Sequence, residues 1–129
     1  MGPTGQLLTF LYTDDLPAMV GFYRDVMGLT PVIDQGATVI LRVNEGAYLG
    51  VSNLAHRPRG TDGVMVTFVR DVDAEYERLS ALGVAFEGPP ATLVGGTVYA
   101  VFLRDPAGYH LEIQEFRNSD WDRLFEGGA

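Results

Sequence analysis

The chain has 129 residues, enough for one domain with a sizeable core, and its 47% hydrophobic and 20% charged residues are typical of a globular protein. It contains no cysteine, which excludes disulfides, thiolate metal ligands and a cysteine nucleophile. The net charge of −8 disfavours nucleic acid and anionic membranes as partners and is compatible with a cationic small ligand. The simpler explanation of the charge is that an acidic surface favours solubility.

No apolar run approaches the roughly 18 residues of a membrane span, so we expect none. The N-terminal residues Met1–Gly5 have neither a basic start nor an apolar core, so a secretory signal peptide is not expected. The absence of cysteine agrees with these observations, and we predict a cytoplasmic protein.

The first half of the chain predicts a strand, a helix and three further strands. An apolar run at Leu7–Thr13 predicts the first strand. Asp15 is the candidate N-cap of an amphipathic helix, in which apolar residues recur with helical spacing as far as Met27, and Gly28 ends it. Three extended segments follow, with the hairpin signal Asn44-Glu45-Gly46 between the last two: Thr30–Ile33, Ala37–Val43 and Ala47–Ser52.

A polar connector at Asn53–Asp62 precedes a second half of the same order. Gly63–Val69 predicts a strand, Asp71 is again the candidate N-cap, and the helix over Val72–Leu82 ends at Gly83. Further extended segments are predicted at Val84–Glu87, Thr92–Val94 and in the two runs of Val98–Phe116.

The last two predicted strands lie within Val98–Phe116 and are joined by Arg104-Asp105-Pro106-Ala107-Gly108. Asp at the first position, Pro at the second and Gly at the fourth match a type I turn. After this turn, strand alternation places His110, Glu112 and Gln114 on one face. This polar row is the first candidate for a functional site.

Each half therefore predicts the order β-α-β-β-β. The segments Phe10–Leu16 and Val66–Val72 align with each other, as do Tyr48–Ser52 and His110–Gln114. One module alone offers a single helix to one face of its sheet, whereas two modules can bury more together. We predict one α+β domain over residues 1–129, with modules at approximately 7–53 and 63–116 and a tail at 117–129 that contains a short helix.

Two segments carry a resemblance to a known family: Asp15-Leu16 followed by Gly21–Leu29, and Phe102–Ile113. With the repeat between them, Leu7–Phe116 resembles the vicinal oxygen chelate superfamily, which includes glyoxalases, extradiol dioxygenases, fosfomycin-resistance enzymes and bleomycin-resistance proteins. The resemblance implies two modules whose curved mixed sheets enclose a cavity, and commonly a homodimer. It does not imply one activity, because one fold hosts many functions.

Metal-dependent members of this superfamily place ligands on the first and the last strand of each module. The resemblance puts Leu8, Val64 and Gly50 at three of these positions and Glu112 at the fourth. Only Glu112 has a donor atom, and one carboxylate does not make a chelate site. We therefore predict no resident metal, no cofactor and no catalytic residue, and expect the protein to be closest in kind to the metal-free bleomycin-resistance type.

Strand alternation assigns residues to the predicted cavity wall. If Leu8 and Val64 face the cavity, every second residue along the same strands does too, whereas Leu11 and Thr67 face the helices. Aromatic residues with a few polar groups are typical of small-molecule sites. The candidate ligand-binding residues are Phe10, Tyr12, Tyr48, Ser52, Phe68, His110, Glu112 and Gln114.

Each of these assignments has a simpler alternative. Core packing explains an aromatic residue such as Phe10, because large apolar side chains are mostly buried. Glu112 either contacts a ligand or is a partly solvated residue paired with His110 or an arginine; a role as general base lacks a visible partner. Trp121 either closes the pocket or, more simply, anchors the tail. The basic connector residues around Arg59 are explained by a solvated loop.

We predict a metal-free small-molecule-binding protein that sequesters an amphipathic aromatic or cationic compound, such as an antibiotic. One alternative is a metal-dependent glyoxalase-like lyase or dioxygenase with an atypical ligand set. Another is an accessory module whose pocket is vestigial. The sequence does not identify the ligand.

Overall fold

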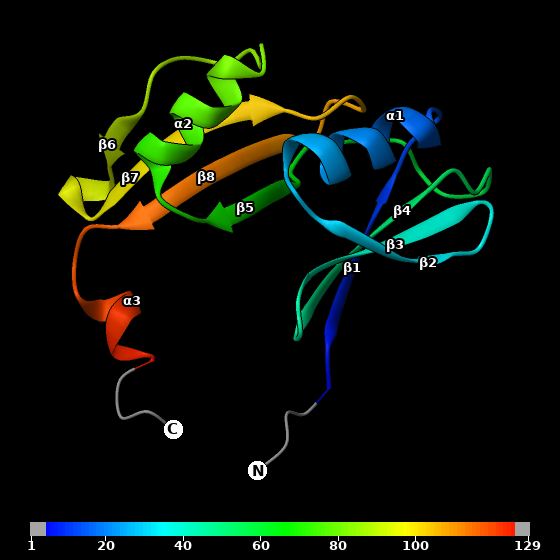
Figure 1. Cartoon of the computed structure of the whole chain (residues 1–129), viewed down its shortest axis with the longest axis horizontal. Helices are drawn as coiled ribbons and strands as arrows, with labels where there is room; N and C mark the ends of the chain where they lie inside the picture. The colour runs from blue at the N-terminus through cyan, green and yellow to red at the C-terminus, as the bar shows by residue number, and fades with distance from the viewer. Residues whose placement is uncertain (1–4, 126–129) are drawn as a thin grey trace. The chain divides into compact units, whose positions relative to one another are not determined.

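The computed structural model describes residues 5–125, and within them each half of the chain forms a four-stranded sheet with a helix against one face (Figure 1). The strand orders are β1-β4-β3-β2 and β5-β8-β7-β6. Both modules have the predicted order β-α-β-β-β, so the predicted α+β class is confirmed. In the described part of the chain, no helix has the length and hydrophobicity needed to cross a membrane.

The first of two compact units comprises the chain up to Asp62 together with Asp105–Gly108. Its elements are β1 (Leu7–Tyr12), α1 (Leu16–Gly21), the π-helical turn η1 (Phe22–Val26), β2 (Thr30–Asp34), β3 (Thr38–Asn44) and β4 (Ala47–Ser52). β1 runs parallel to β4, and the other neighbours are antiparallel. The sequence predicted one continuous helix here, but it changes to π geometry at Phe22, where the Met27 amide donates to the Phe22 carbonyl.

The second unit comprises Gly63–Arg104 and the chain from Tyr109 onward. Its elements are β5 (Met65–Val69), α2 (Val72–Ala81), β6 (Ala91–Leu93), the 3₁₀ turn η2 (Val94–Gly96), β7 (Val98–Arg104), β8 (His110–Phe116) and α3 (Asp120–Arg123). The prediction of an extended segment at Val84–Glu87 is wrong as a strand, and the Glu87 amide only makes an isolated bond to the Phe102 carbonyl. Residues 126–129 of the predicted tail lie outside the described residues.

The predicted helix caps are confirmed in both units. Asp15 Oδ1 accepts a hydrogen bond from the Ala18 amide at 3.1 Å, and Asp71 Oδ1 accepts one from the Ala74 amide at 3.0 Å. A carboxylate at this position satisfies an amide that has no partner within the helix. These two caps fix where each helix starts relative to the strand before it.

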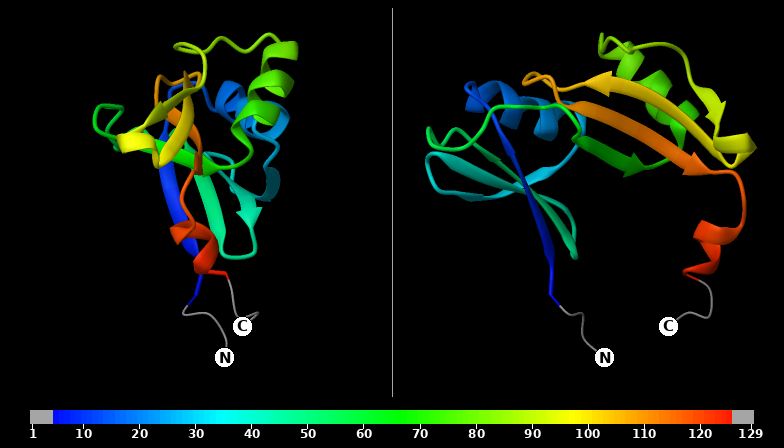
Figure 2. Two further views of the ribbon diagram at one scale, coloured as in Figure 1. Left: turned by 90° about the vertical axis from the view of Figure 1, so that its left-hand side faces the viewer. Right: turned by 180° about the vertical axis from the view of Figure 1, so that it is seen from behind.

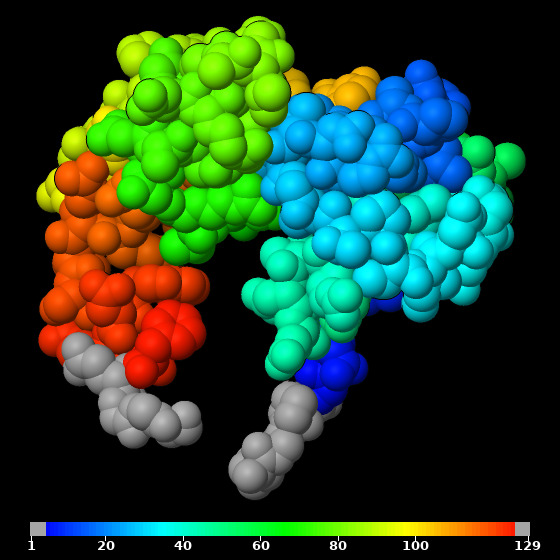
Figure 3. Space-filling model, viewed as in Figure 1, coloured from blue at the N-terminus to red at the C-terminus, as the bar shows by residue number. Residues whose placement is uncertain are grey.

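Each helix buries one face of its own sheet. In the first unit Leu11, Met19 and Leu41 are at most 1% exposed, and in the second unit Val72, Leu79 and Ile113 are fully buried. In Figure 3 the atoms of α2 and of the segment after it cover much of the second sheet on that side. Among the described residues, neither α1 nor α2 covers the opposite face of its sheet, and these two open faces are where the candidate residues must be sought.

The turn between β7 and β8 belongs to the first unit. The Tyr23 hydroxyl donates to Asp105 Oδ2 at 2.7 Å, and Asp105 Oδ1 accepts from the Ala107 amide at 2.9 Å. Asp105 is 5% exposed and Tyr23 is fully buried. The Asp-Pro-Ala-Gly turn that the sequence predicted is therefore also a buried polar attachment to η1.

The connector after β4 is ordered by the side chain of Arg59. The guanidinium of Arg59 donates to four oxygens: Asp14 Oδ1 and the carbonyls of Asn53, Leu54 and Arg57. The connector is exposed, as expected of a solvated loop, and the donors of Arg59 close it on itself. A planar group with five N–H donors is suited to hold several carbonyls together.

Replacing Glu75 with glutamine should lower the free energy of unfolding by about 1 kcal/mol at pH 7. The Glu75 carboxylate accepts from Arg78 and Arg70 at 2.8–3.0 Å, and these hydrogen bonds, that of Arg78 first, lower its pKa. Because the pKa is lower in the folded protein, the ionised carboxylate stabilises the fold. This stabilisation is fully present above the pKa of the unfolded chain, about 4.3, and is lost as the pH falls through the pKa of the folded protein.

Urea unfolding of the two proteins, from pH 7 downward to about pH 2, should show a difference that shrinks in acid. Glu77→Gln is the matched control, because Glu77 lies exposed on the same helix. A Glu75→Gln difference that persists unchanged in acid would contradict the assigned cause.

Candidate functional site

The open face of the first sheet is assembled by strand pairing. Leu8, Phe10 and Tyr12 of β1 pair with Tyr48, Gly50 and Ser52 of β4, respectively. Leu11 faces α1 and is 1% exposed, whereas Phe10 is 42% exposed. The alternation predicted for this strand is therefore confirmed, and all candidates of the first module share the open face.

Gly50 leaves space that the Phe10 ring fills. A Cβ built on Gly50 would lie 2.6 Å from Cδ1 and 2.7 Å from Cε1 of Phe10, and 3.4 Å from Cδ1 of Ile40. Real side chains do not approach so closely, so any residue larger than glycine must displace the ring. The position at which the resemblance expects a donor side chain is thus occupied by hydrocarbon from β1.

A hollow of about 500 Å³ lies on the open face of the first sheet. It is lined by Gln6, Leu8, Val32, Ile33, Ile40, Arg42 and Tyr48. Val32 and Ile33 are consecutive and both line it, because the β2–β3 register shifts between Pro31 and Ile33. A β-bulge turns an extra side chain toward the same face, and bulges are frequent beside binding sites.

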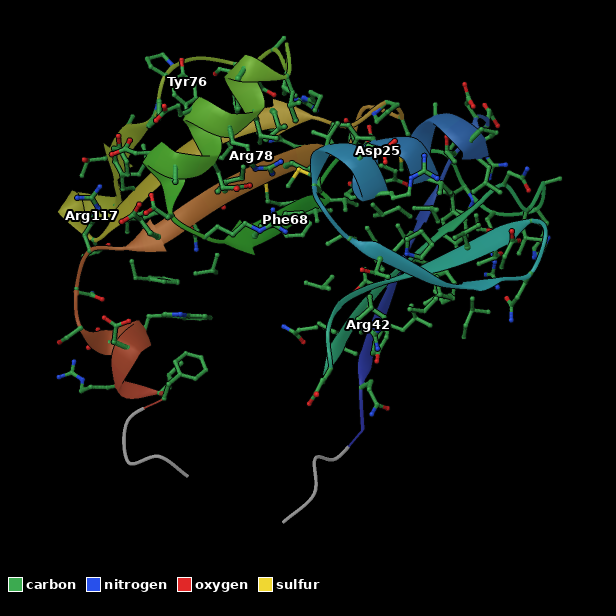
Figure 4. All side chains as sticks on the ribbon, in the orientation of Figure 1. Asp25, Arg42, Phe68, Tyr76, Arg78 and Arg117 are labelled. Carbon is green, nitrogen blue, oxygen red and sulfur yellow. The ribbon has the colours of Figure 1, made fainter. Side chains whose placement is uncertain are left out.

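Arg42 is the charged member of this lining. It pairs with Tyr48 across the β3–β4 hairpin and lies on the part of the sheet away from α1 (Figure 4). Tyr48 is half-buried, and its hydroxyl donates a long hydrogen bond of 3.4 Å to the Glu45 carbonyl. The hollow therefore combines an apolar floor with a guanidinium and a phenol at one side.

Ser52 and Tyr12 lie at the other end of the same face. Ser52 is fully buried, and its hydroxyl accepts from Thr38 Oγ1 at 2.9 Å and from the Leu54 amide at 3.3 Å. Tyr12 is half-buried and stacks on Phe10, with 6.4 Å between ring centroids. The Ser52 hydroxyl holds the end of the sheet together, whereas Phe10, Tyr12 and Tyr48 form an aromatic strip along it.

In the second unit the alternation predicted for β5 is wrong. Thr67 pairs with Glu112, and Phe68 pairs with Ile113. Phe68 is 7% exposed on the α2 side, where the Arg70 guanidinium lies 4.8 Å from its ring centroid (Figure 4). Phe68 is therefore a core residue and does not share a face with Glu112.

The error has a simple geometric cause. The loop from β1 to Asp15 is one residue longer than the loop from β5 to Asp71, as shown by Leu11 and Phe68, which occupy the same place in their sheets. Counting back from the N-caps therefore gives the correct face in the first module and the opposite face in the second. The residue that pairs with His110, at the place expected for Val64, is Met65.

Glu112 lies in the middle of the open face of the second sheet. Its Oε1 accepts from the Thr67 hydroxyl at 3.0 Å, and it pairs with Thr67 on one side and Phe102 on the other. The carboxylate is half-buried, and Gln114 follows it along the same face. Thr67 thus holds the carboxylate beside an aromatic ring.

His110 lies two residues from Glu112, beside a hollow of about 210 Å³ lined by Glu87, Gly88, Pro89, Phe102 and His110. Its Nε2 is 3.2 Å from Glu87 Oε1, but the geometry does not make a hydrogen bond. Arg104 Nε donates to the same oxygen of Glu87 at 2.9 Å. The predicted pairing of His110 with Glu112 is replaced by contact with Glu87.

The tail is anchored on the second sheet. Trp121 stacks on Phe116, the last residue of β8, with 4.8 Å between centroids and 13° between planes. The other neighbour of Trp121 is Phe125, at 5.7 Å. Since Trp121 makes ring contacts with both, this arrangement agrees with the anchoring role and not with a lid.

The residues present do not fit the metal site that the resemblance implies. The residues at the four expected positions are Leu8 and Gly50 in the first unit and Met65 and Glu112 in the second, and only Glu112 has a hard oxygen donor. Among residues 5–125 no three His, Asp or Glu side chains come together in a group able to hold an ion. A hard divalent cation needs several oxygen or imidazole donors, which this set does not supply.

Sequence reasoning missed Arg42, Ile33 and Glu87. Arg42 and Tyr48 stand at equal distances from Glu45, the middle of the hairpin signal, so hairpin register could have placed them together. Ile33 joins the hollow through a bulge, which the sequence does not mark. Glu87 lies in an irregular segment, where no periodicity assigns a face.

Figure 2 shows each sheet from two further sides, with its helix against one face. Solved structures share this arrangement. A lactoylglutathione lyase from Agrobacterium tumefaciens is 29% identical, with a TM-score of 0.71 over 89% of this chain and 96% of that one. A glyoxalase/bleomycin resistance protein/dioxygenase from Nocardioides is 26% identical, with a TM-score of 0.72 over 90% and 85%.

A probable lactoylglutathione lyase of Vibrio cholerae serotype O1 is 27% identical, with 83% of this chain and 87% of the relative covered. The sequence model of one family matches residues 5–113, which is most of the chain and covers the first module and nearly all of the second. The chain belongs to the Glyoxalase/Bleomycin resistance protein/Dioxygenase superfamily.

Proposed function

We propose that this protein binds an amphipathic aromatic small molecule without a resident metal ion. The observation that carries the proposal is the Phe10 ring over Gly50, which fills the space of a donor side chain with hydrocarbon. Leu8 and Met65 add no hard donor on the first strands. A site of this composition can hold a ligand but lacks the groups to activate it through a chelated cation.

The hollow on the first sheet has the make-up of a ligand site. Its volume of about 500 Å³ is within the usual range for small molecules of roughly 300–1,000 Å³. Leu8, Val32 and Ile33 offer exposed apolar surface, and the ring of Tyr48 suits a planar ligand. Binding would remove this exposed apolar surface from water, which is the main source of affinity.

A second candidate function is a glyoxalase-like lyase. Two relatives at 27% and 29% identity bear the name lactoylglutathione lyase, and Glu112 keeps the one donor of the expected set. The Thr67 hydroxyl donates a hydrogen bond to the Glu112 carboxylate on the open face, which would orient it as a metal ligand or a base. This function needs further metal donors that the chain would have to supply from other positions.

Purified protein should contain well under one equivalent of transition metal per chain and show no lactoylglutathione lyase activity, with or without added Zn²⁺, Ni²⁺, Mn²⁺ or Fe²⁺. Elemental analysis and a spectrophotometric assay measure the two. A panel of aromatic amphiphiles, antibiotics included, should contain compounds that raise the melting temperature, since a ligand of the native state stabilises it.

The decisive opposite result is one metal equivalent per chain together with activity that is restored by that metal and lost in Glu112→Ala. It would replace binding by catalysis as the function. A panel without any stabilising compound, in a protein without metal, would instead favour an accessory role. The homodimer implied by the resemblance remains a prediction, for which light scattering is the test.

A further inference from the structure

We propose that the ligand of the first-sheet hollow is an amphipathic anion, whose carboxylate pairs with Arg42 while its apolar body lies on Leu8, Ile33 and Ile40. This inference rests on the proposed binding function and specifies the chemical class of the ligand. It differs from the cationic ligand that the net charge of −8 suggests. Local charge in the hollow, not the total charge of the chain, decides which head group fits.

Arg42 lines the hollow without an ion-pair partner among the described residues. All nine basic residues of the chain are arginines, and seven of them form ion pairs with carboxylates. Arg42 forms neither an ion pair nor a side-chain hydrogen bond with any of the residues 5–125, although the chain has 17 acidic residues. An unpaired guanidinium in an otherwise uncharged lining is available to an anion.

Exposed apolar side chains surround the Arg42 guanidinium. Leu8 is 42% exposed, Val32 38% and Ile33 50%, although all three are large hydrocarbon side chains. The bulge in β2 brings Val32 and Ile33 to the hollow together. A cation beside a concave apolar surface of this size complements a ligand that has an acidic group at one end and an apolar group at the other.

The alternatives fit the hollow less well. A cationic ligand would be repelled by the guanidinium of Arg42. An apolar surface of a second copy would take water from the guanidinium without supplying a counter-charge, which is costly. A carboxylate accepts two parallel hydrogen bonds from the guanidinium fork and leaves the remaining donors in water.

The test uses two probes of the same shape and opposite charge, 2-naphthoate and 2-naphthylmethylammonium, in calorimetric titrations of the full chain. Naphthoate should bind and the ammonium should not. Arg42→Gln should weaken naphthoate binding by at least about tenfold, because a hydrogen bond to a charged group is lost. The matched control is Arg57→Gln, which removes an equal charge from the connector and should leave the affinity unchanged.

Two further measurements separate a built site from general attraction. Arg42→Lys keeps the charge but not the fork, and should give an intermediate affinity. Ile33→Ser removes apolar contact, and should weaken naphthoate binding while its dependence on salt stays that of the parent. Circular dichroism and melting temperatures of all variants establish that each is folded before its affinity is compared.

Equal affinity of parent and Arg42→Gln for naphthoate, or tighter binding of the ammonium probe, overturns the inference and leaves metal-free binding intact. Failure of both probes to bind at millimolar concentration also overturns it. So does a shift from dimer to monomer in Ile33→Asp with naphthoate affinity unchanged, because a second copy would then cover this face. Metal-restored lyase activity is the separate result that removes the proposed function itself.

Discussion

Replacing Asp105 with alanine is expected to lower the free energy of unfolding by about 3 kcal/mol. The carboxylate is 5% exposed and accepts from the Tyr23 hydroxyl at 2.7 Å and from the Ala107 amide at 2.9 Å. Its removal leaves a buried hydroxyl without this acceptor and a turn without its internal bond. Urea unfolding at neutral pH, followed by circular dichroism, measures the loss.

Two further variants test this assignment. Tyr23→Phe removes one of the same hydrogen bonds from the other side and should cost about 2 kcal/mol. Asp25→Ala is the control, because Asp25 is an exposed carboxylate on η1 that pairs with exposed Arg24, and it should leave the urea midpoint nearly unchanged (Figure 4). The buried role is refuted if Asp105→Ala and Asp25→Ala unfold at the same urea concentration.

The second large effect concerns the space above Gly50. Gly50→Leu should destabilise the protein by about 1–3 kcal/mol, because the new side chain meets the Phe10 ring and Ile40. Combining it with Phe10→Ala should recover part of the loss, since the ring that causes the clash is gone. A double-mutant cycle of unfolding free energies gives the coupling between the two positions directly.

Gly60→Leu provides the control for this cycle. Gly60 has no heavy atom near a built Cβ and no left-handed backbone, so the substitution should be nearly neutral. If Gly50→Leu is also neutral while Phe10 is present, the ring moves aside at little cost. The space would then be open to a donor side chain, and the Phe10 ring would no longer exclude a metal ligand from this position.

Much of the fold follows from local patterns in the sequence. Asp15 and Asp71 are positioned to cap helices, Asn44-Glu45-Gly46 forms the hairpin, and Asp105-Pro106-Ala107-Gly108 forms the turn. In each case a few neighbouring residues determine the backbone conformation, so the pattern is readable without tertiary contacts. The two β-α-β-β-β modules follow from these signals.

The candidate site is less predictable because it depends on the phase of strands. A loop that is one residue shorter before α2 turns Phe68 into the core and brings Thr67 to Glu112. A bulge in β2 adds Val32 and Ile33 to the same hollow. Phase errors of one residue move a side chain to the opposite face, and nothing local in the sequence marks them.

The membership of Asp105–Gly108 in the first unit has a consequence for how the chain can be divided. The backbone leaves the first unit after Asp62, returns for four residues and leaves again, so a fragment that ends at the connector lacks the acceptor of the Tyr23 hydroxyl. Expressed alone, the first half should therefore be less stable than the same residues are in the whole chain.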